Sequence, residues 1–238
     1  MKKVRLSILF GILSALGIYF IAESTLSNLL PENTDLTLPT VLLTGQTFLM
    51  VTILSILGLN MLPKTGLRLY QASSNGTVWI KAALAGVGVG FFIQALDALY
   101  FADRLEAMNG YQPESSLSAM LGGVLYGGVG EEVLIRLFLM TLIVWMVTKL
   151  KRGAAPSNMV YIVAILISSL VFAIGHLPAN LNFFGELSTM VVFRALLLNG
   201  VGGILFGWLY WKHGLVLAIF AHMIAHISMH LIFIPILF

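Results

Sequence analysis

The sequence contains no cysteine and little charge. Among its 238 residues the absence of cysteine excludes disulfide bridges, thiolate nucleophiles and cysteine-ligated metal sites. Only 10% of the residues are charged and 59% are hydrophobic, whereas about 25% are charged in an average soluble domain. This composition excludes a soluble globular protein and predicts a chain that lies in a membrane.

Long apolar runs recur along the whole chain. A membrane-spanning helix needs about 17–25 mostly apolar residues. Seven runs suit this purpose, at residues 6–22, 38–62, 79–100, 117–150, 159–176, 187–210 and 214–236. The predicted fold class is therefore all-α, a polytopic bundle of seven transmembrane helices, or eight if run 117–150 forms two pieces. We expect residues 1–238 to form a single integral-membrane domain with a motif-bearing core at about 117–238.

Basic residues gather in alternate loops. They precede the first run at residues 2–5 and follow the fourth at 149–152, whereas acidic residues dominate the opposite loops. By the positive-inside rule this pattern predicts a cytoplasmic N-terminus, in what we expect to be a bacterial cytoplasmic membrane. Because the cations lie in short loops, the net charge of +3 indicates topology and not a nucleic-acid partner.

Three charged residues interrupt the fourth run, in the stretch YGGVGEEVLIRLFLM at 126–140. Ionisable groups within a membrane span cost about 2.5–3.5 kcal/mol each near the bilayer centre and by default mark function. Glu132 and Arg136 are four residues apart, so on a helix they can pair and hold it in place. Glu131 points about 100° away from Glu132. It would face the bundle interior unpaired, where a desolvated carboxylate suits a general base. A structural ion pair with one spectator is the alternative interpretation.

Histidines provide partners for this carboxylate. His176 ends the fifth run in FAIGH, and His222 and His226 lie four residues apart in FAHMIAHISMH. That spacing places His222 and His226 on one face of the seventh helix. A single histidine in an apolar helix is most often a packing residue. This set, together with an unpaired glutamate, indicates a functional site.

These motifs carry a resemblance. EEVLIR matches EExxxR, FAIGH matches FxxxH, and HMIAH occupies the place of HxxxN. In this order the chain resembles the CPBP family, the CAAX-type prenyl-protein proteases and bacteriocin-processing proteins, also called Abi. The resemblance covers residues 131–226 and implies a glutamate-dependent intramembrane endopeptidase. The expected partners are membrane lipid and a peptide or protein substrate at the membrane.

The resemblance also implies roles for single residues. Glu131 would activate a water with the help of His176, and that water would attack the scissile carbonyl. His222 and His226 would hold the oxyanion, with no cofactor required. The family usually has asparagine where this chain has His226. An imidazole can donate a hydrogen bond as an amide does, but its ability to do so depends on pH.

Two other interpretations stay open. Glu131, His176, His222 and His226 could form a zinc site, although Met223 replaces the glutamate that follows the first histidine in H-E-x-x-H. The chain could also be a non-proteolytic membrane immunity or scaffold protein of the same family. A transporter with an intramembrane proton relay is disfavoured, because we find no inverted repeat between the halves.

The depth of the motifs adds one prediction. A straight helix from Leu117 would place Glu131 about 21 Å from the membrane face. His176, at the end of its run, would lie near that face, and His222 near the middle of the membrane. We therefore predict that residues 122–130 bend or re-enter, so that Glu131 opens the crossing helix. Such backbone is tolerated where it lines a water-filled cavity.

Overall fold

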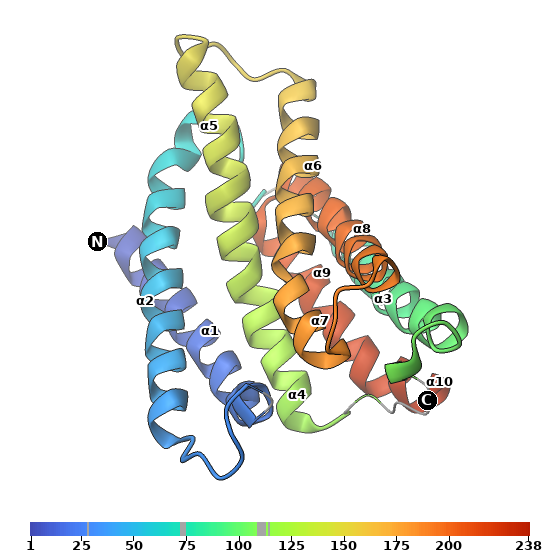
Figure 1. Ribbon diagram of the computed structural model, residues 1–238. Coiled ribbons are helices and arrows are strands. Elements are labelled where there is room, and N and C mark those ends of the chain that lie inside the picture. The colour runs from blue at the N-terminus through green and yellow to red at the C-terminus, as the bar shows by residue number, and fades with distance from the viewer. Residues whose placement is uncertain (28, 72–74, 109–112, 114) are drawn as a thin grey trace.

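The protein is an all-helical membrane bundle. The computed structural model describes residues 1–27, 29–71, 75–108, 113 and 115–238 (Figure 1). Within these ranges seven helical segments are long and apolar enough to cross a membrane, which confirms the predicted fold class. They are Lys2–Ser27, Thr37–Lys64, Gly76–Phe101, Leu117–Leu150, Asn158–Phe184, Thr189–His213 and Leu215–Leu237. The chain is therefore an integral membrane protein.

Several spans combine two or more helical elements. In chain order the elements are α1 (Lys2–Ser27), α2 (Thr37–Met61), η1 (Leu62–Lys64), α3 (Gly76–Leu96), η2 (Asp97–Phe101), η3 (Glu106–Met108), α4 (Leu117–Gly122), η4 (Gly123–Glu131), η5 (Val133–Met140), α5 (Thr141–Leu150), α6 (Asn158–Gly175), α7 (Leu177–Phe184), α8 (Thr189–His213), α9 (Leu215–Ser228), η6 (Met229–Phe233) and α10 (Ile234–Leu237). Of the η elements, η1 and η3 are 3₁₀ turns, and η2, η4, η5 and η6 are π-helical.

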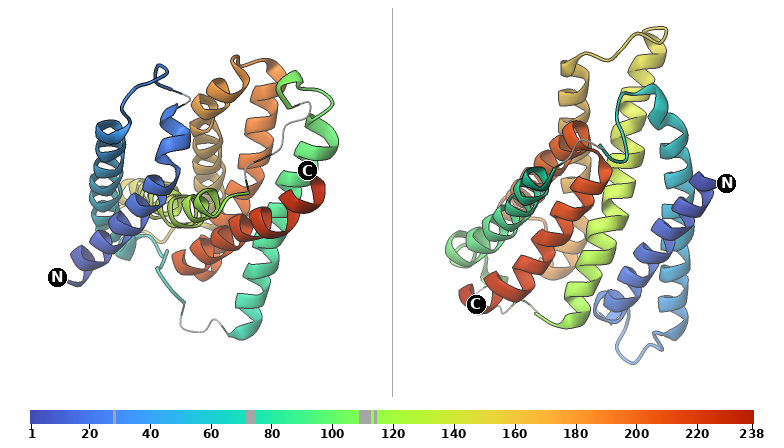
Figure 2. Two further views of the ribbon diagram at one scale, coloured as in Figure 1. Left: turned by 90° about the horizontal axis from the view of Figure 1, so that it is seen from below. Right: turned by 180° about the vertical axis from the view of Figure 1, so that it is seen from behind.

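The fourth span lies at the centre of the bundle. Its segment η4 contacts α1 and α9, and η5 contacts α2, α6 and α8. Seen from below, the other spans surround it (Figure 2). Further close pairs are α1 with α2, α3 with α9, and α6 with α8. The spans that carry the three motifs therefore share one interior.

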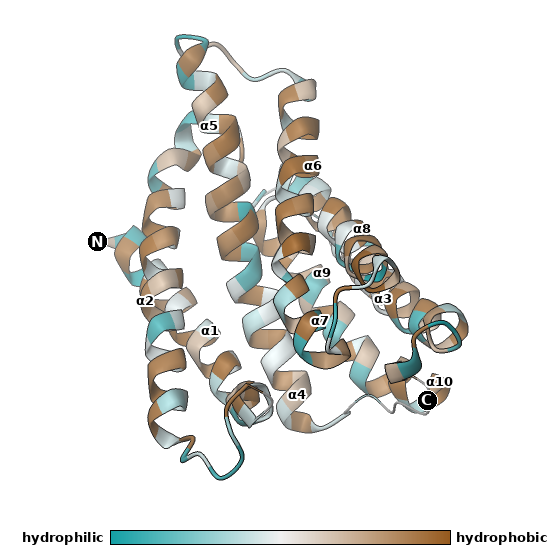
Figure 3. Cartoon of the chain, in the orientation of Figure 1, coloured by the Kyte–Doolittle hydropathy of each residue, from teal (hydrophilic) through white to brown (hydrophobic). Residues whose placement is uncertain are grey.

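Apolar side chains cover the outside of the bundle. On α6, for example, Leu166 and Leu170 are 50% and 53% exposed. Figure 3 shows hydrophobic residues over most of the helical surface, with hydrophilic residues in the loops and within the fourth span and α9. A soluble protein would not expose such a surface, whereas lipid chains can cover it.

The predicted break in the fourth span is wrong. Leu117–Leu150 forms one continuous helical segment of 34 residues, so the alternative of eight spans is wrong as well. Instead of breaking, η4 and η5 adopt i→i+5 hydrogen bonding, a rare form that is frequent at functional sites. The predicted position of His176 near the membrane face is wrong, because the fifth span continues past this residue through α7 to Phe184. His176 is therefore not at the end of its span, and the motifs meet without a break.

Candidate active site

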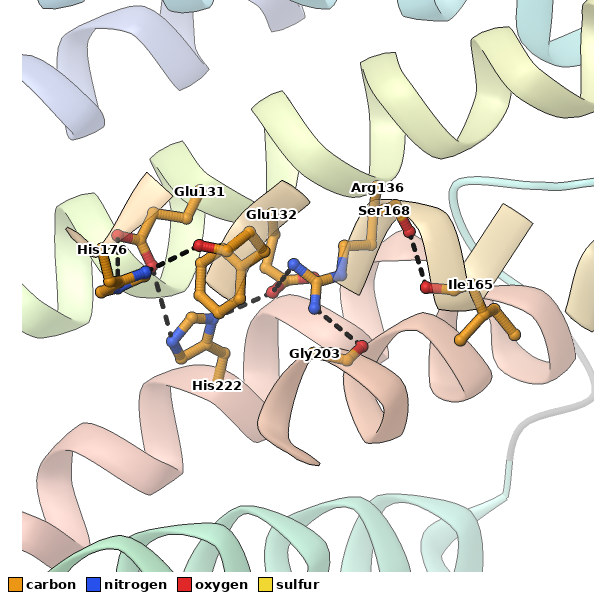
Figure 4. Close-up of polar contacts among 9 residues, drawn as sticks. Glu131, Glu132, Arg136, Ile165, Ser168, His176, Gly203 and His222 are labelled. Carbon is orange, nitrogen blue, oxygen red and sulfur yellow. Dashed lines mark hydrogen bonds and ion pairs between the residues drawn. The ribbon is translucent and has the colours of Figure 1, made fainter. Parts of the chain in front are cut away.

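The fourth span places a buried ion pair beside a second carboxylate. Glu132 Oε1 lies 3.3 Å from Arg136 Nη1, and neither side chain is exposed. Arg136 Nη2 donates a hydrogen bond of 2.9 Å to the carbonyl oxygen of Gly203 on α8 (Figure 4). The structure thus contains the pair that the spacing predicted, and this pair ties the fourth span to α8. Glu131, the preceding residue, is left for other partners.

Each of two histidines has one ring nitrogen engaged by a fixed acceptor. His222 Nδ1 lies 2.9 Å from Glu132 Oε1, and His176 Nδ1 lies 2.8 Å from the carbonyl oxygen of Phe172. A carboxylate and a carbonyl oxygen accept hydrogen bonds, so Nδ1 carries the proton in both rings. The free nitrogen of each ring is therefore Nε2.

Both Nε2 atoms face Glu131. His176 Nε2 lies 4.0 Å from Glu131 Oε1, and His222 Nε2 lies 3.9 Å from Glu131 Oε2. Figure 4 shows the Glu131 carboxylate between the two rings, which come from different spans. These separations exceed a direct hydrogen bond but suit a bridging water. We call Glu131, Glu132, Arg136, His176 and His222 the glutamate–histidine cluster.

Aromatic rings fix the two imidazoles. Phe206 stacks on His222 at a centroid distance of 4.5 Å and an interplanar angle of 19°. Phe172 meets the His176 ring edge-on at 4.7 Å, and the Arg136 guanidinium carbon lies 5.1 Å from the Phe172 centroid. The phenylalanine of the FxxxH motif therefore contacts both the histidine and the buried arginine.

His226 lies beside the cluster without touching Glu131. Its ring stacks on His222 at 5.1 Å. Gly123 and Gly127 make room for it, because a Cβ atom at either position would overlap the imidazole. Among the described residues no ion pair joins His226 to Glu131, although both line the same cavity.

Two hollows meet at Glu131. The first, the inner cavity, has a volume of about 340 Å³ and is bordered by α1, α3, the end of α6, α8, α9 and the fourth span. The second, the outer groove, measures about 370 Å³ and has apolar walls from η5, α6 and α7, including Leu134, Val171 and Ala179. Val171 is 44% exposed, so the groove lies on the lipid-facing side. The residues that line both hollows are Tyr126, Glu131, Phe172 and His176.

The described residues contain no preformed zinc site. In the part of the chain that the structure describes, no three or more histidine, aspartate or glutamate side chains are grouped so as to hold a metal ion. The candidate ligands divide instead, since His222 is held by Glu132 while His226 stacks on the His222 ring. Metal analysis therefore stays the experiment that decides this alternative.

A second polar cluster inside the bundle was not predicted. Arg194 Nε donates to Asp97 Oδ1 at 2.7 Å, and Arg194 Nη2 donates to Asp97 Oδ2. Arg194 Nη1 donates to Asn180 Oδ1 at 3.0 Å. We call Asp97, Arg194 and Asn180 the Asp97 cluster. The sequence does contain an indication of this cluster. Asp97 and Arg194 each interrupt an apolar run, and charged residues within membrane spans usually pair with one another.

Tyr126 is a further residue that the motifs did not indicate. It lies in η4, five residues before Glu131, and lines both hollows with that glutamate. It belongs to none of the three motifs, so only the three-dimensional arrangement identifies it.

One comparison with known proteins gives a match. Residues 113–228 match the family model described as type II CAAX prenyl endopeptidase Rce1-like. The matched segment contains the EExxxR, FxxxH and HxxxH stretches together with α8. No curated protein and no solved structure matches the chain.

Proposed function

Since residues 113–228 belong to the Rce1-like type II CAAX prenyl endopeptidase family, we propose that this protein is a glutamate-dependent intramembrane endopeptidase. A protease family implies a protein or peptide as substrate. One observation carries the proposal for this chain. Glu131 faces the Nε2 atoms of His176 and His222 at 4.0 and 3.9 Å, while its neighbour Glu132 pairs with the arginine.

The hydrolytic step uses a water held between Glu131 and His176. Glu131 takes a proton from this water, whose oxygen attacks the scissile carbonyl carbon. The carbonyl oxygen becomes an oxyanion of the tetrahedral intermediate. Glu131 then passes its proton to the leaving nitrogen as the C–N bond breaks, which restores the carboxylate. One carboxylate thus acts first as general base and then as general acid.

The oxyanion needs donors that are already aligned. Glu132 holds Nδ1–H of His222 and so directs Nε2 toward Glu131 and the inner cavity. This nitrogen donates to the oxyanion when it carries a proton as well. Loss of one such donor typically costs about 2.7–4 kcal/mol of transition-state stabilisation. We assign His226, in the same cavity, as a second donor, and Glu132 and Arg136 as the pair that positions His222.

The two hollows accommodate different parts of a substrate. The inner cavity reaches the polar groups and suits the peptide around the scissile bond. The outer groove has apolar walls and suits an apolar chain or side chain that arrives from the lipid. The family description names prenylated CAAX substrates for its members. For this protein we propose the broader class of a membrane-proximal peptide or protein.

We further propose that the N-terminus lies in the cytoplasm of a bacterial cell and that residues 117–238 form the functional core of a single domain. The lysines and arginines of alternate loops support this orientation. Reporter fusions at the two chain ends test it, since seven crossings place the ends on opposite sides of the membrane.

Glu131→Gln tests the activity directly. We expect purified wild-type protein in liposomes to cleave peptides, and Glu131→Gln to lose about 10²–10⁴-fold in rate, the usual contribution of a general base. Glu186→Gln, at an exposed glutamate outside the cluster, is the matched control. Sequencing of new protein N-termini in cells with wild-type protein or Glu131→Ala identifies the substrates. Full cleavage by Glu131→Gln would refute the proposal. A biological effect that survives in this variant would favour the scaffold alternative.

Chelation separates the water mechanism from the zinc mechanism. We expect the purified protein to contain no stoichiometric zinc and to keep its rate in EDTA, because Glu131 and the histidines act without a metal in the proposed mechanism. A rate that falls with chelator and returns with added Zn²⁺ would establish the zinc alternative.

A further inference from the structure

The Asp97 cluster joins the end of α3 to α7 and α8, two helices that follow it by many residues in the sequence. Asp97 begins η2 after α3, Arg194 lies in α8, and Asn180 lies in α7. All three side chains are largely buried, with Asp97 6% and Asn180 9% exposed. Arg194 directs two donor groups to Asp97 and a third to Asn180. Because its guanidinium is planar, these bonds fix its direction in space.

The cluster continues to the backbone of His176. Asn180 Oδ1 accepts from Arg194, and Asn180 Nδ2 donates a bond of 2.8 Å to the carbonyl oxygen of His176. Chemistry decides this orientation of the amide, because a guanidinium only donates and a carbonyl only accepts. An aspartate at position 180 would have nearly the same shape and would keep the arginine contact. It would lack the donor toward His176.

His176 is the hinge residue between α6 and α7. Helix α6 ends at Gly175 and α7 begins at Leu177. The His176 carbonyl accepts from the backbone N–H of Asn180 at 3.0 Å as well as from its side chain, while the ring is held by the carbonyl of Phe172. Both the backbone and the ring of His176 are therefore restrained from within the fifth span. Arg194 of α8 bonds to Asn180 and so links this part of the span to a different span.

We infer that the Asp97 cluster is a positioning network that holds His176 Nε2 opposite Glu131. None of its members touches the reacting atoms, so they act through His176 and are not catalytic residues. Two of the helices that the network joins also border the inner cavity, through Val89 and Ile93 of α3 and Leu198 of α8. A substrate in the cavity therefore contacts the same helices that orient the histidine. The inference deepens the proposed peptidase function and rests on it.

Two substitutions at Asn180 separate the two bonds of its amide. Asn180→Asp keeps the acceptor for Arg194 and loses the donor to His176, whereas Asn180→Ala loses both. We expect kcat for peptide cleavage to fall about 10–100-fold in both variants with KM little changed, since small displacements of a reacting group have effects of this size. If Asn180→Ala lost activity while Asn180→Asp matched the wild type, the link to His176 would be refuted.

Asn75→Asp is the matched control. Asn75 Oδ1 accepts from the backbone N–H of Val78 at the start of α3, and an aspartate there can accept the same bond. Thermal unfolding in detergent shows whether each variant is folded. We expect Asn75→Asp to keep wild-type kcat and Asn180→Asp to unfold as a single species.

A spectroscopic measurement tests the network without any substrate. The chain has five histidines, so ¹⁵N-histidine NMR is tractable, and His176→Gln identifies the resonances of His176. We expect Asn180→Asp to shift the His176 ring resonances and to leave those of His213 unchanged. An unshifted His176 resonance would overturn the network. Failure of wild-type protein to cleave any peptide would overturn the peptidase proposal instead.

Discussion

Among the described residues, two carboxylate–arginine pairs inside the bundle differ in their hydrogen bonding. In the Asp97 cluster, Arg194 makes two bonds to Asp97 and one to Asn180. In the glutamate–histidine cluster, Arg136 makes a single hydrogen bond, to Gly203. Within the described part of the chain, no residue hydrogen-bonds to Arg136 Nε, Arg136 Nη1 or Glu132 Oε2. This second pair is nevertheless the more deeply buried of the two.

The difference indicates what each pair is for. Buried polar atoms are normally satisfied, and exceptions concentrate at functional sites. In the Asp97 pair both carboxylate oxygens accept hydrogen bonds from Arg194. We infer that this pair has a structural role, which is to fix the direction of the Arg194 side chain. The Glu132–Arg136 pair lies next to Glu131 and His222, and we propose that it positions His222 beside the inner cavity. Four substitutions sharpen or break this comparison.

Arg136→Gln is expected to have the largest effect on stability. It leaves the buried Glu132 without the arginine and with His222 Nδ1–H as its remaining partner. The loss of one member of a buried pair costs about 3–5 kcal/mol. Unfolding in detergent measures the loss. The double variant Glu132→Gln/Arg136→Gln should recover most of the lost stability, because neither member of the pair then carries a charge. Wild-type stability in Arg136→Gln would mean that the contact between Glu132 and Arg136 does not stabilise the fold.

Asp97→Asn should cost less, about 1.5–3 kcal/mol, the usual range for a hydrogen bond to a charged group. The asparagine oxygen still accepts one bond from Arg194, and the Arg194 side chain is 19% exposed, which lowers the cost of an unpaired charge. The same unfolding assay ranks the two pairs. An effect of Asp97→Asn larger than that of Arg136→Gln would reverse the comparison.

Gly127→Ala tests the space that His226 occupies next to the glutamate–histidine cluster. Its Cβ would overlap the His226 ring, and overpacking of this kind costs about 1–3 kcal/mol. We expect a loss near the lower end, because the imidazole can shift toward the inner cavity. Gly200→Ala is the control, since nothing lies near a Cβ there, and alanine is the better helix former. Equal stability of the two variants would show that His226 does not occupy this space.

Asp35→Ala gives the smallest expected effect and an exposed reference for both pairs. The backbone N–H of Thr37 donates to Asp35 Oδ1 at 2.9 Å and lowers the pKa of this carboxyl. A lowered pKa in the folded state means that the bond stabilises the protein above the unfolded-state pKa. The contribution is lost as the pH falls through the lowered pKa. We expect wild type and Asp35→Ala to differ slightly at neutral pH and to converge in acid, in unfolding experiments across pH.

Some of this architecture follows from local rules. The seven spans could be predicted because the length of an apolar run decides whether it crosses a bilayer. The pair of Glu132 and Arg136 could be predicted because the helical period places residues four apart on one face. Both predictions use interactions within a single helix.

The rest depends on how the helices pack. The fifth run was expected to end at His176, yet α7 continues the span with Pro178 in its first turn, where proline is tolerated. Asp97 and Arg194 are 97 residues apart, and no local period connects them. The histidine partners of Glu131 were predicted from the set of intramembrane histidines, and their individual roles from the resemblance of three motifs. Their roles stay predictions until the variants are measured.

The position of Glu131 on the border of two hollows has a consequence for how products would leave. In the proposed mechanism, a peptide cut at this carboxylate would have one fragment in the inner cavity and the other in the outer groove. The fragments would then depart in different directions, one out of the bundle interior and one into lipid, without having to pass each other. An inhibitor bound in either hollow would therefore stop turnover, because it would block the exit of one of the two fragments.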